Sequence, residues 1–269
     1  MPRGSGTPGK SLSTREFWKG AIVGAILVAA SADAGFAQQL LGEKLYADRV
    51  GGIEPGNYSA GDNVHFTLDP LGDKYLLRVS SQPEVFVLHT DRASLGGRVL
   101  KYDSGSTALQ VSGWGALTLY TDDQPAGLPA VREGDSTPPL PSQITLGDFQ
   151  NAAQDEVQHL AYAHQLHLSF AADWNALAGD ANARALVFDA MQNTARGLDR
   201  FASRDDGRNA LIQKVSSVKL VVGKSGVLLS GRTLVVSVDA GRGYGGRQSS
   251  RAVAQALSRL LSVKQATND

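Results

Sequence analysis

The sequence contains no cysteine in its 269 residues. This absence excludes disulfide bonds, zinc–thiolate sites and cysteine nucleophiles, so packing and hydrogen bonds must stabilise the fold. The sequence also lacks net charge, because 26 basic residues balance 26 acidic ones. A positive excess that would attract nucleic acid is therefore missing, and we expect no nucleic-acid partner.

Long apolar runs are scarce, and the clearest one lies near the N-terminus. Residues 21–30 carry no charge, follow a basic leader and precede small residues around Ala34 and Ala37. This order is typical of a secretory signal, and the run is shorter than the roughly 20 residues of a bilayer span. We predict a signal peptide over residues 1–37 and export to the periplasm or cell envelope of a bacterium. We expect cleavage after Ala37, with Ala34 as second choice; an uncleaved anchor is the alternative.

Hydrophobic residues make up 42 % of the chain, which is enough for a folded core. We predict one α+β domain over residues 38–269. Its first part carries short apolar segments with alternating periodicity, separated by Gly, Pro, Asp and Ser turns. These strand candidates are 64–68, 75–79, 85–88, 97–102, 108–111 and 116–120. They favour an antiparallel β meander, either a small barrel or a sandwich.

The second part of the domain is predicted to be mainly helical. Residues 122–143 contain five prolines and are expected to form a loop between the two parts. Helical periodicity then predicts a hairpin of two helices, over 146–177 and 181–203. The C-terminal segments 218–222, 227–229 and 233–238 favour a β-hairpin or three-stranded unit. A final helix should begin at Ser249 or Ser250, since serine is a good N-cap.

A glycine-rich loop precedes this final helix. Gly241, Gly243 and Gly246 have the spacing of a dinucleotide fingerprint, but too little sequence follows for the remaining βαβ units. We therefore expect no dinucleotide cofactor. A smaller anion site is the other possibility, because Arg242 and Arg247 stand next to a helix N-terminus. The alternative is that both arginines are simply solvated.

Other motifs for chemistry are incomplete. Tyr102-Asp-Ser-Gly105 has the letters of an aspartic-protease loop, but such enzymes need two aspartates and only Asp103 has this context. A polar turn between strands explains the same letters. His159, His164 and His167 lie on the first predicted helix without a second Glu-x-x-His pair. We expect no metal and no cofactor.

Three segments carry a resemblance to a known family. They are residues 83–105, with Leu-Gly-Gly-Arg-Val-Leu-Lys-Tyr-Asp-Ser-Gly at their end, 109–115, with Gly-Trp-Gly, and 185–191. Together they resemble an uncharacterised family of exported bacterial proteins, catalogued as a domain of unknown function. The resemblance implies export and a single family-wide domain. It brings no activity, cofactor or catalytic residue to this chain.

The function that best fits these observations is non-enzymatic binding or scaffolding in the envelope. The alternatives are a hydrolase of envelope material that uses Asp103 and a carrier that holds a small ligand in the β-rich part. We predict a binding surface around Arg98, Tyr102, Asp103 and Trp114, because Trp, Tyr and Arg are enriched at binding hot spots. Trp114 could instead plug the end of the sheet between two glycines. The ligand, the partner and the oligomeric state stay open.

Overall fold

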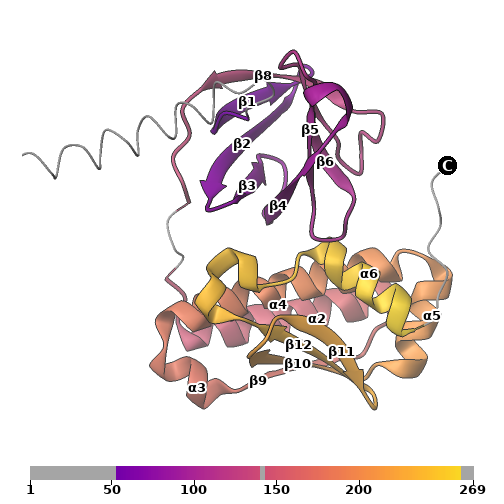
Figure 1. Ribbon diagram of the computed structural model, residues 1–269. Helices are drawn as coiled ribbons and strands as arrows, with labels where there is room; N and C mark the ends of the chain where they lie inside the picture. The colour runs from indigo at the N-terminus through magenta and orange to yellow at the C-terminus, as the bar shows by residue number, and fades with distance from the viewer. Residues whose placement is uncertain (1–52, 140–142, 262–269) are drawn as a thin grey trace, which may run out of the picture. The chain divides into compact units, whose positions relative to one another are not determined.

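The N-terminal part of the described chain is a closed antiparallel barrel. A computed structural model describes residues 53–139 and 143–261, so the predicted signal peptide and its cleavage site lie outside the described residues. Each strand pairs with the next, and the first pairs with the last. The strands are β1 (Gly56–Ala60), β2 (Val64–Leu71), β3 (Lys74–Val79), β4 (Val85–Arg92), β5 (Arg98–Lys101), β6 (Thr107–Val111), β7 (Leu117–Leu119) and β8 (Leu128–Gly134) (Figure 1). The predicted meander is thus a barrel rather than a sandwich.

Alternate residues of each strand fill the barrel. Along β2, Phe66 and Leu68 are buried, as are Leu77 and Val79 of β3. Leucines at the same inward parity in β4–β7 complete one hydrophobic cluster. This is the period of two that a sheet with one buried face requires. The interior is therefore occupied by the barrel's own side chains.

The expected loop over residues 122–143 is wrong for residues 128–134, which form β8. Ala130 of this strand pairs with both Ala60 and Leu117, and the strand closes the barrel. Pro129 lies near the start of β8, where a missing N–H costs little. The strand pairing that closes the barrel thus overrides the tendency of this proline-rich segment to form a loop. Local sequence patterns do not indicate such closure.

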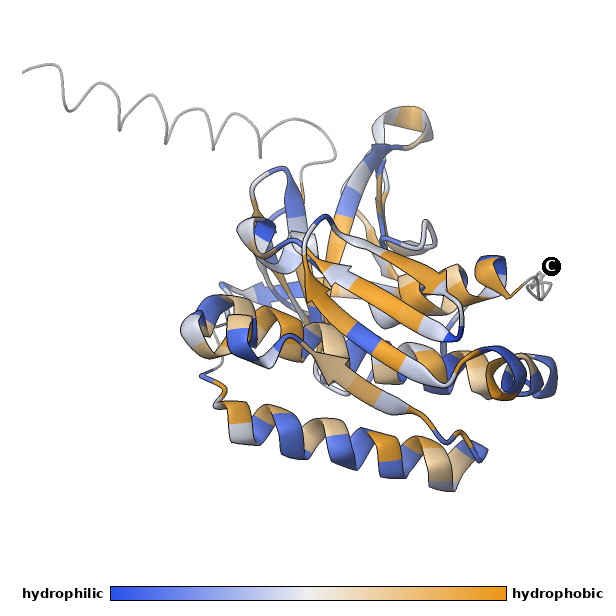
Figure 2. Ribbon diagram, turned by 90° about the horizontal axis from the view of Figure 1, so that it is seen from below, coloured by the Kyte–Doolittle hydropathy of each residue, from blue (hydrophilic) through white to orange (hydrophobic). Residues whose placement is uncertain are grey.

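The C-terminal part combines helices with a second sheet. Its helices are α2 (Leu146–His164), α3 (Trp174–Gly179), α4 (Ala181–Ala202), α5 (Asp205–Lys214) and α6 (Ser250–Leu260). Its strands are β9 (Ser169–Ala172), β10 (Ser217–Val222), β11 (Gly226–Ser230) and β12 (Thr233–Val238), in the order β11-β12-β10-β9. β9, β10 and β12 are parallel, and β11 is antiparallel at one edge. Figure 2 shows that these strands are mostly hydrophobic.

The predicted helix over 146–177 is wrong beyond His164. A capping box of Thr145 and Asp148 starts α2, and Gln165 in the left-handed conformation ends it. The next residues form β9, which pairs with β10 over four residue pairs. Helical periodicity continued by chance through Phe170 and Trp174, which now lie on a strand and in a separate short helix.

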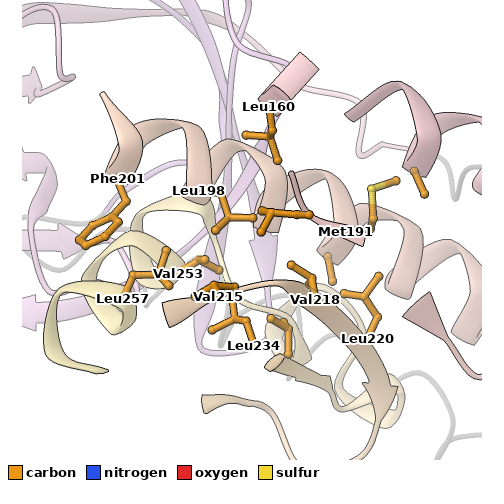
Figure 3. Packing of buried hydrophobic residues seen from close by; sticks show 14 of the residues in the cluster. Leu160, Met191, Leu198, Phe201, Val215, Val218, Leu220, Leu234, Val253 and Leu257 are labelled. Atoms are coloured by element: carbon orange, nitrogen blue, oxygen red, sulfur yellow. The ribbon is translucent and has the colours of Figure 1, made fainter. Parts of the chain in front are cut away.

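The predicted helix over 181–203 and the final helix are confirmed. Asp180 caps α4, and Ser249 caps α6. The two helices approach closely because Gly197 has no side chain: a Cβ there would lie 2.6 Å from Val253 Cβ. Figure 3 shows Leu198, Val253 and neighbouring residues meeting in the second hydrophobic cluster. The α+β class predicted from the sequence is thus the observed one.

Candidate functional site

The N-terminus of α6 is capped by two carboxylates from the barrel. The Ser249 N–H donates to Asp103 Oδ2 at 2.8 Å, and its hydroxyl donates to Asp103 Oδ1. The Ser250 N–H and hydroxyl donate to the two oxygens of Glu84 at 2.8 and 2.5 Å. Carboxylates at a helix N-terminus meet both free N–H groups and the positive end of the helix dipole. The barrel is therefore docked through a specific set of charge-assisted hydrogen bonds.

Glu84 is buried, with 3 % of its surface exposed. Burial raises its pKa, and the hydrogen bonds from Ser250 and the charge of Arg247 oppose that rise. A buried carboxylate is stable only when its oxygens have partners, and Ser250 supplies them. The sequence gives little sign of this role, since Glu84 simply stands between a proline and a hydrophobic strand.

Arginines reinforce the same junction. Arg247, 5 % exposed, forms an ion pair with Asp189 of α4 and donates to the Val85 carbonyl at 2.7 Å. Arg251 lies 4.2 Å from the centre of the Tyr102 ring and pairs with Asp122 at 2.7 Å. Cation–π contact and ion pairing thus tie α6 to two barrel loops.

A hollow of about 590 Å³ lies beside this junction. One face of α4 forms a wall, the 3₁₀-helical segment η2 (Ala240–Gly246) another, and the start of β4 a third. The volume falls in the range of small-molecule sites, which is roughly 300–1,000 Å³. Its lining residues are Pro83, Val85, Pro139, Asn182, Ala185, Leu186, Phe188, Asp189, Gln192, Arg196, Ala240, Gly243 and Tyr244.

The polar groups of this hollow converge from α4 and η2. Arg196 donates to Asn193 Oδ1 at 3.1 Å and to Gln192 Oε1 at 2.9 Å, and it makes no salt bridge with any described carboxylate. The Cζ atom of Arg247 lies 5.1 Å from the centre of the Tyr244 ring, and burial raises the pKa of the Tyr244 phenol. Burial also raises the pKa of Asp189, against the charge of Arg247. The hollow therefore offers hydrogen-bond donors on an apolar floor.

The residues of the predicted binding surface do not gather on one face. Tyr102 is buried, and Arg251 covers its ring. Asp103 is exposed, and each of its two carboxylate oxygens accepts a hydrogen bond from Ser249 at the start of α6. Trp114 is 81 % exposed in the β6–β7 loop, and Arg98 begins β5. Tyr102 and Asp103 thus contact the N-terminal end of α6, whereas Arg98 and Trp114 lie elsewhere on the barrel.

The two arginines of the predicted anion site are also separated. Arg247 is buried against Asp189, while Arg242 is exposed on η2. The glycine loop itself is part of the hollow, through Gly243 with φ of +52°. Sequence reasoning therefore found the loop but missed α4 as its partner. Asp189 was the available signal, as a single charge inside the apolar segment 185–191.

The helical histidines are engaged with Asp199. His164 Nε2 lies 2.7 Å from Asp199 Oδ1, and His159 Nε2 lies 3.6 Å from the same oxygen. No group of three His, Asp or Glu side chains within residues 53–139 and 143–261 is placed to hold a metal ion. His159, His164 and Asp199 therefore connect α2 to α4.

These features define a class of protein: an eight-stranded barrel docked through carboxylate–serine hydrogen bonds onto an α/β layer, with a ligand-sized hollow at the junction. The chain belongs to the family described as Domain of unknown function (DUF4908), which it matches over residues 41–257. No curated protein and no solved structure gives a match. Over the residues described, none of the helices has the length and apolar character that crossing a membrane demands.

Proposed function

We propose that this protein is an exported, non-enzymatic binding protein whose site is the hollow between α4, η2 and β4. The observation that carries the proposal is the match of size and lining: about 590 Å³, an apolar floor and a few convergent donors. Export rests on the charged leader and apolar run of residues 1–37.

The lining indicates the chemistry of the ligand. Leu186 and Phe188 offer apolar surface. Arg196 offers a positive charge that forms no salt bridge with a described carboxylate, and its guanidinium is held in place by hydrogen bonds to Gln192 and Asn193. A molecule with an apolar body and an acceptor or anionic head group would use both. This site differs from a carrier site inside the barrel, because the barrel interior is filled by buried leucines such as Leu68, Leu88 and Leu109.

A hydrolase centred on Asp103 finds less support. Each oxygen of Asp103 already accepts a hydrogen bond from Ser249. A general acid or base must reach the proton that it transfers, and this carboxylate faces a helix end instead. Binding is therefore the function that the geometry favours.

The proposal is testable with anilinonaphthalene sulfonate, a probe with an apolar body and an anionic head. We expect saturable fluorescence with one probe per chain. Ala185→Phe should abolish it by filling the hollow, and Arg196→Gln should weaken it about tenfold by removing charged donors. Ala163→Phe, at an exposed position of α2, is the matched control and should bind normally.

Two results would contradict the proposal. One is unchanged probe binding in Ala185→Phe, checked for native folding by circular dichroism. The other is an equal loss in the control Ala163→Phe, which would mean that the probe reports general loosening of the fold. Native mass spectrometry of the exported chain would then identify any molecule that co-purifies.

A further inference from the structure

The second end of the barrel carries a group of residues that the docking of α6 does not use. The strand directions place the β4–β5 and β6–β7 loops at one end, and the loops that contain Glu84, Asp103 and Asp122 at the other. We call Arg92, Leu95, Arg98 and Trp114 the free rim.

The free rim exposes two large apolar side chains. Leu95 is 88 % exposed and Trp114 is 81 % exposed. Their loops lie in direct contact, because a Cβ on Gly113 would collide with the Leu95 carbonyl. Leu95 also has a φ of +56°, a left-handed conformation that leucine rarely adopts. This backbone strain is not compensated by burial of the Leu95 side chain. Residues with strained backbones often lie in functional loops.

The free rim is also basic. Arg92 and Arg98 stand directly opposite one another in the β4–β5 register. Neither forms a salt bridge with any described residue, whereas Asp91 and Lys101 pair at 2.8 Å on the opposite face of the same hairpin. Like charges in a directly opposed pair destabilise a hairpin. An external anion would relieve that repulsion.

The β4–β5 hairpin extends past β3 on one side, while β5 stays paired with β6 as far as Arg98. β3 pairs with β4 only as far as Leu88, so residues 89–92 pair with β5 alone. Four residues of strand extend by roughly 13 Å. Leu95 and the two arginines thus stand clear of the β2–β3 turn beside them.

We propose that the free rim docks on a membrane surface that contains acidic phospholipid. Tryptophan favours the region between headgroups and acyl chains, leucine inserts below it, and arginines bind lipid phosphates. Charge complementarity favours acidic lipid as the occupant, since neither arginine forms a salt bridge with any residue that the structure describes. Two apolar side chains and two charges give reversible attachment rather than a permanent anchor.

The test uses the chain without residues 1–37, which retains every described residue and lacks the apolar leader. Sedimentation with vesicles of phosphatidylglycerol and phosphatidylcholine should pellet it, and vesicles of phosphatidylcholine alone should pellet much less. Arg92→Gln with Arg98→Gln should weaken binding about 25-fold, from roughly fivefold per arginine. Leu95→Asn with Trp114→Ser should weaken it at least about tenfold.

A matched control and a local readout make the test specific. Tyr162→Ser removes an aromatic side chain that is 93 % exposed on α2, and it should leave vesicle binding unchanged. In a Trp174→Phe background Trp114 is the remaining tryptophan of the shortened chain, and its emission should shift to the blue on acidic vesicles.

Three results would overturn the proposal. The first is no binding to the acidic vesicles. The second is binding that survives loss of Leu95 and Trp114. The third is a dimer in the absence of lipid that Trp114→Ser dissociates, which would assign the free rim to a second copy of the chain.

Discussion

The two ends of the barrel differ in how far their polar groups are satisfied. At the docked end, Glu84, Asp103 and Asp122 each have partners in the helical layer, and Glu84 is almost fully buried. At the free rim, Arg92 and Arg98 have no salt bridge with a described residue, and Leu95 and Trp114 face solvent. The docked end therefore has a structural role, and the free rim is a surface available for contact with another molecule.

This difference teaches that residues of the predicted binding surface that are close in sequence lie at different ends of the barrel. Tyr102, Asp103 and Trp114 lie within thirteen positions of one another in the sequence. A strand reverses direction between them, so they fall at opposite ends of the barrel. Hot-spot residue types near one another in sequence can thus serve unrelated purposes.

The largest expected effect is a loss of stability when a carboxylate at the docked end is removed. Glu84→Ala leaves the Ser250 N–H and hydroxyl buried without acceptors, so we expect a loss of about 3 kcal/mol in the free energy of unfolding. Urea denaturation measures it. Glu133→Ala, an exposed glutamate of β8, is the control and should change stability by less than about 0.5 kcal/mol. Equal losses in the two variants would contradict the asymmetry.

A smaller effect should appear as a pH dependence. Burial raises the pKa of Glu84 above its ordinary value of 4.5. The folded state therefore holds this proton more tightly, so the stabilisation is present below the ordinary pKa and is lost as pH rises through the raised one. Glu84→Gln removes this titration. The stability of the wild type minus that of the variant should fall as pH rises across the same window.

This difference is measured by denaturant titrations from acid pH to neutrality. Subtraction of the two proteins cancels the carboxylates that they share. A difference that is flat, or that grows with pH, would mean that Glu84 titrates normally in the folded chain.

The smallest effect concerns the free rim and has the opposite sign. Leu95→Asn should raise the free energy of unfolding by about 0.5 kcal/mol, because asparagine tolerates the left-handed conformation better than leucine. Leu260→Asn, at a partly exposed leucine of α6, is the control and should destabilise slightly. Thermal denaturation measures the change in stability of both variants. A destabilised Leu95→Asn variant would show that Leu95 is needed for the fold.

Local patterns predicted much of the fold. Alternation marked β2–β7, and serine at position 249 marked the start of α6, because both signals depend on neighbouring residues. β8 and β9 were not predicted. β9 pairs with the distant β10, and β8 pairs both with the neighbouring β7 and with the distant β1. The barrel closes between residues about 70 positions apart, as Ala60 pairs with Ala130.

The candidate site was harder to predict for the same reason. Asp103 and Ser249 are 146 positions apart, and Glu84 and Ser250 are 166 apart. The hollow likewise combines η2 with α4 and the start of β4. The sequence showed the glycine loop as unusual, but only the tertiary structure shows which helix faces it.

The capping of α6 from the barrel has a consequence for the order of folding. The barrel is complete once residue 134 has been synthesised, whereas α6 is the last helix of the described chain. During synthesis, Glu84 and Asp103 are therefore hydrated long before their serine partners exist. Contacts of such long sequence separation form slowly. Docking of α6 is therefore expected to be a late step, and chaperones or proteases that meet the unfinished chain would find the helical layer open until then.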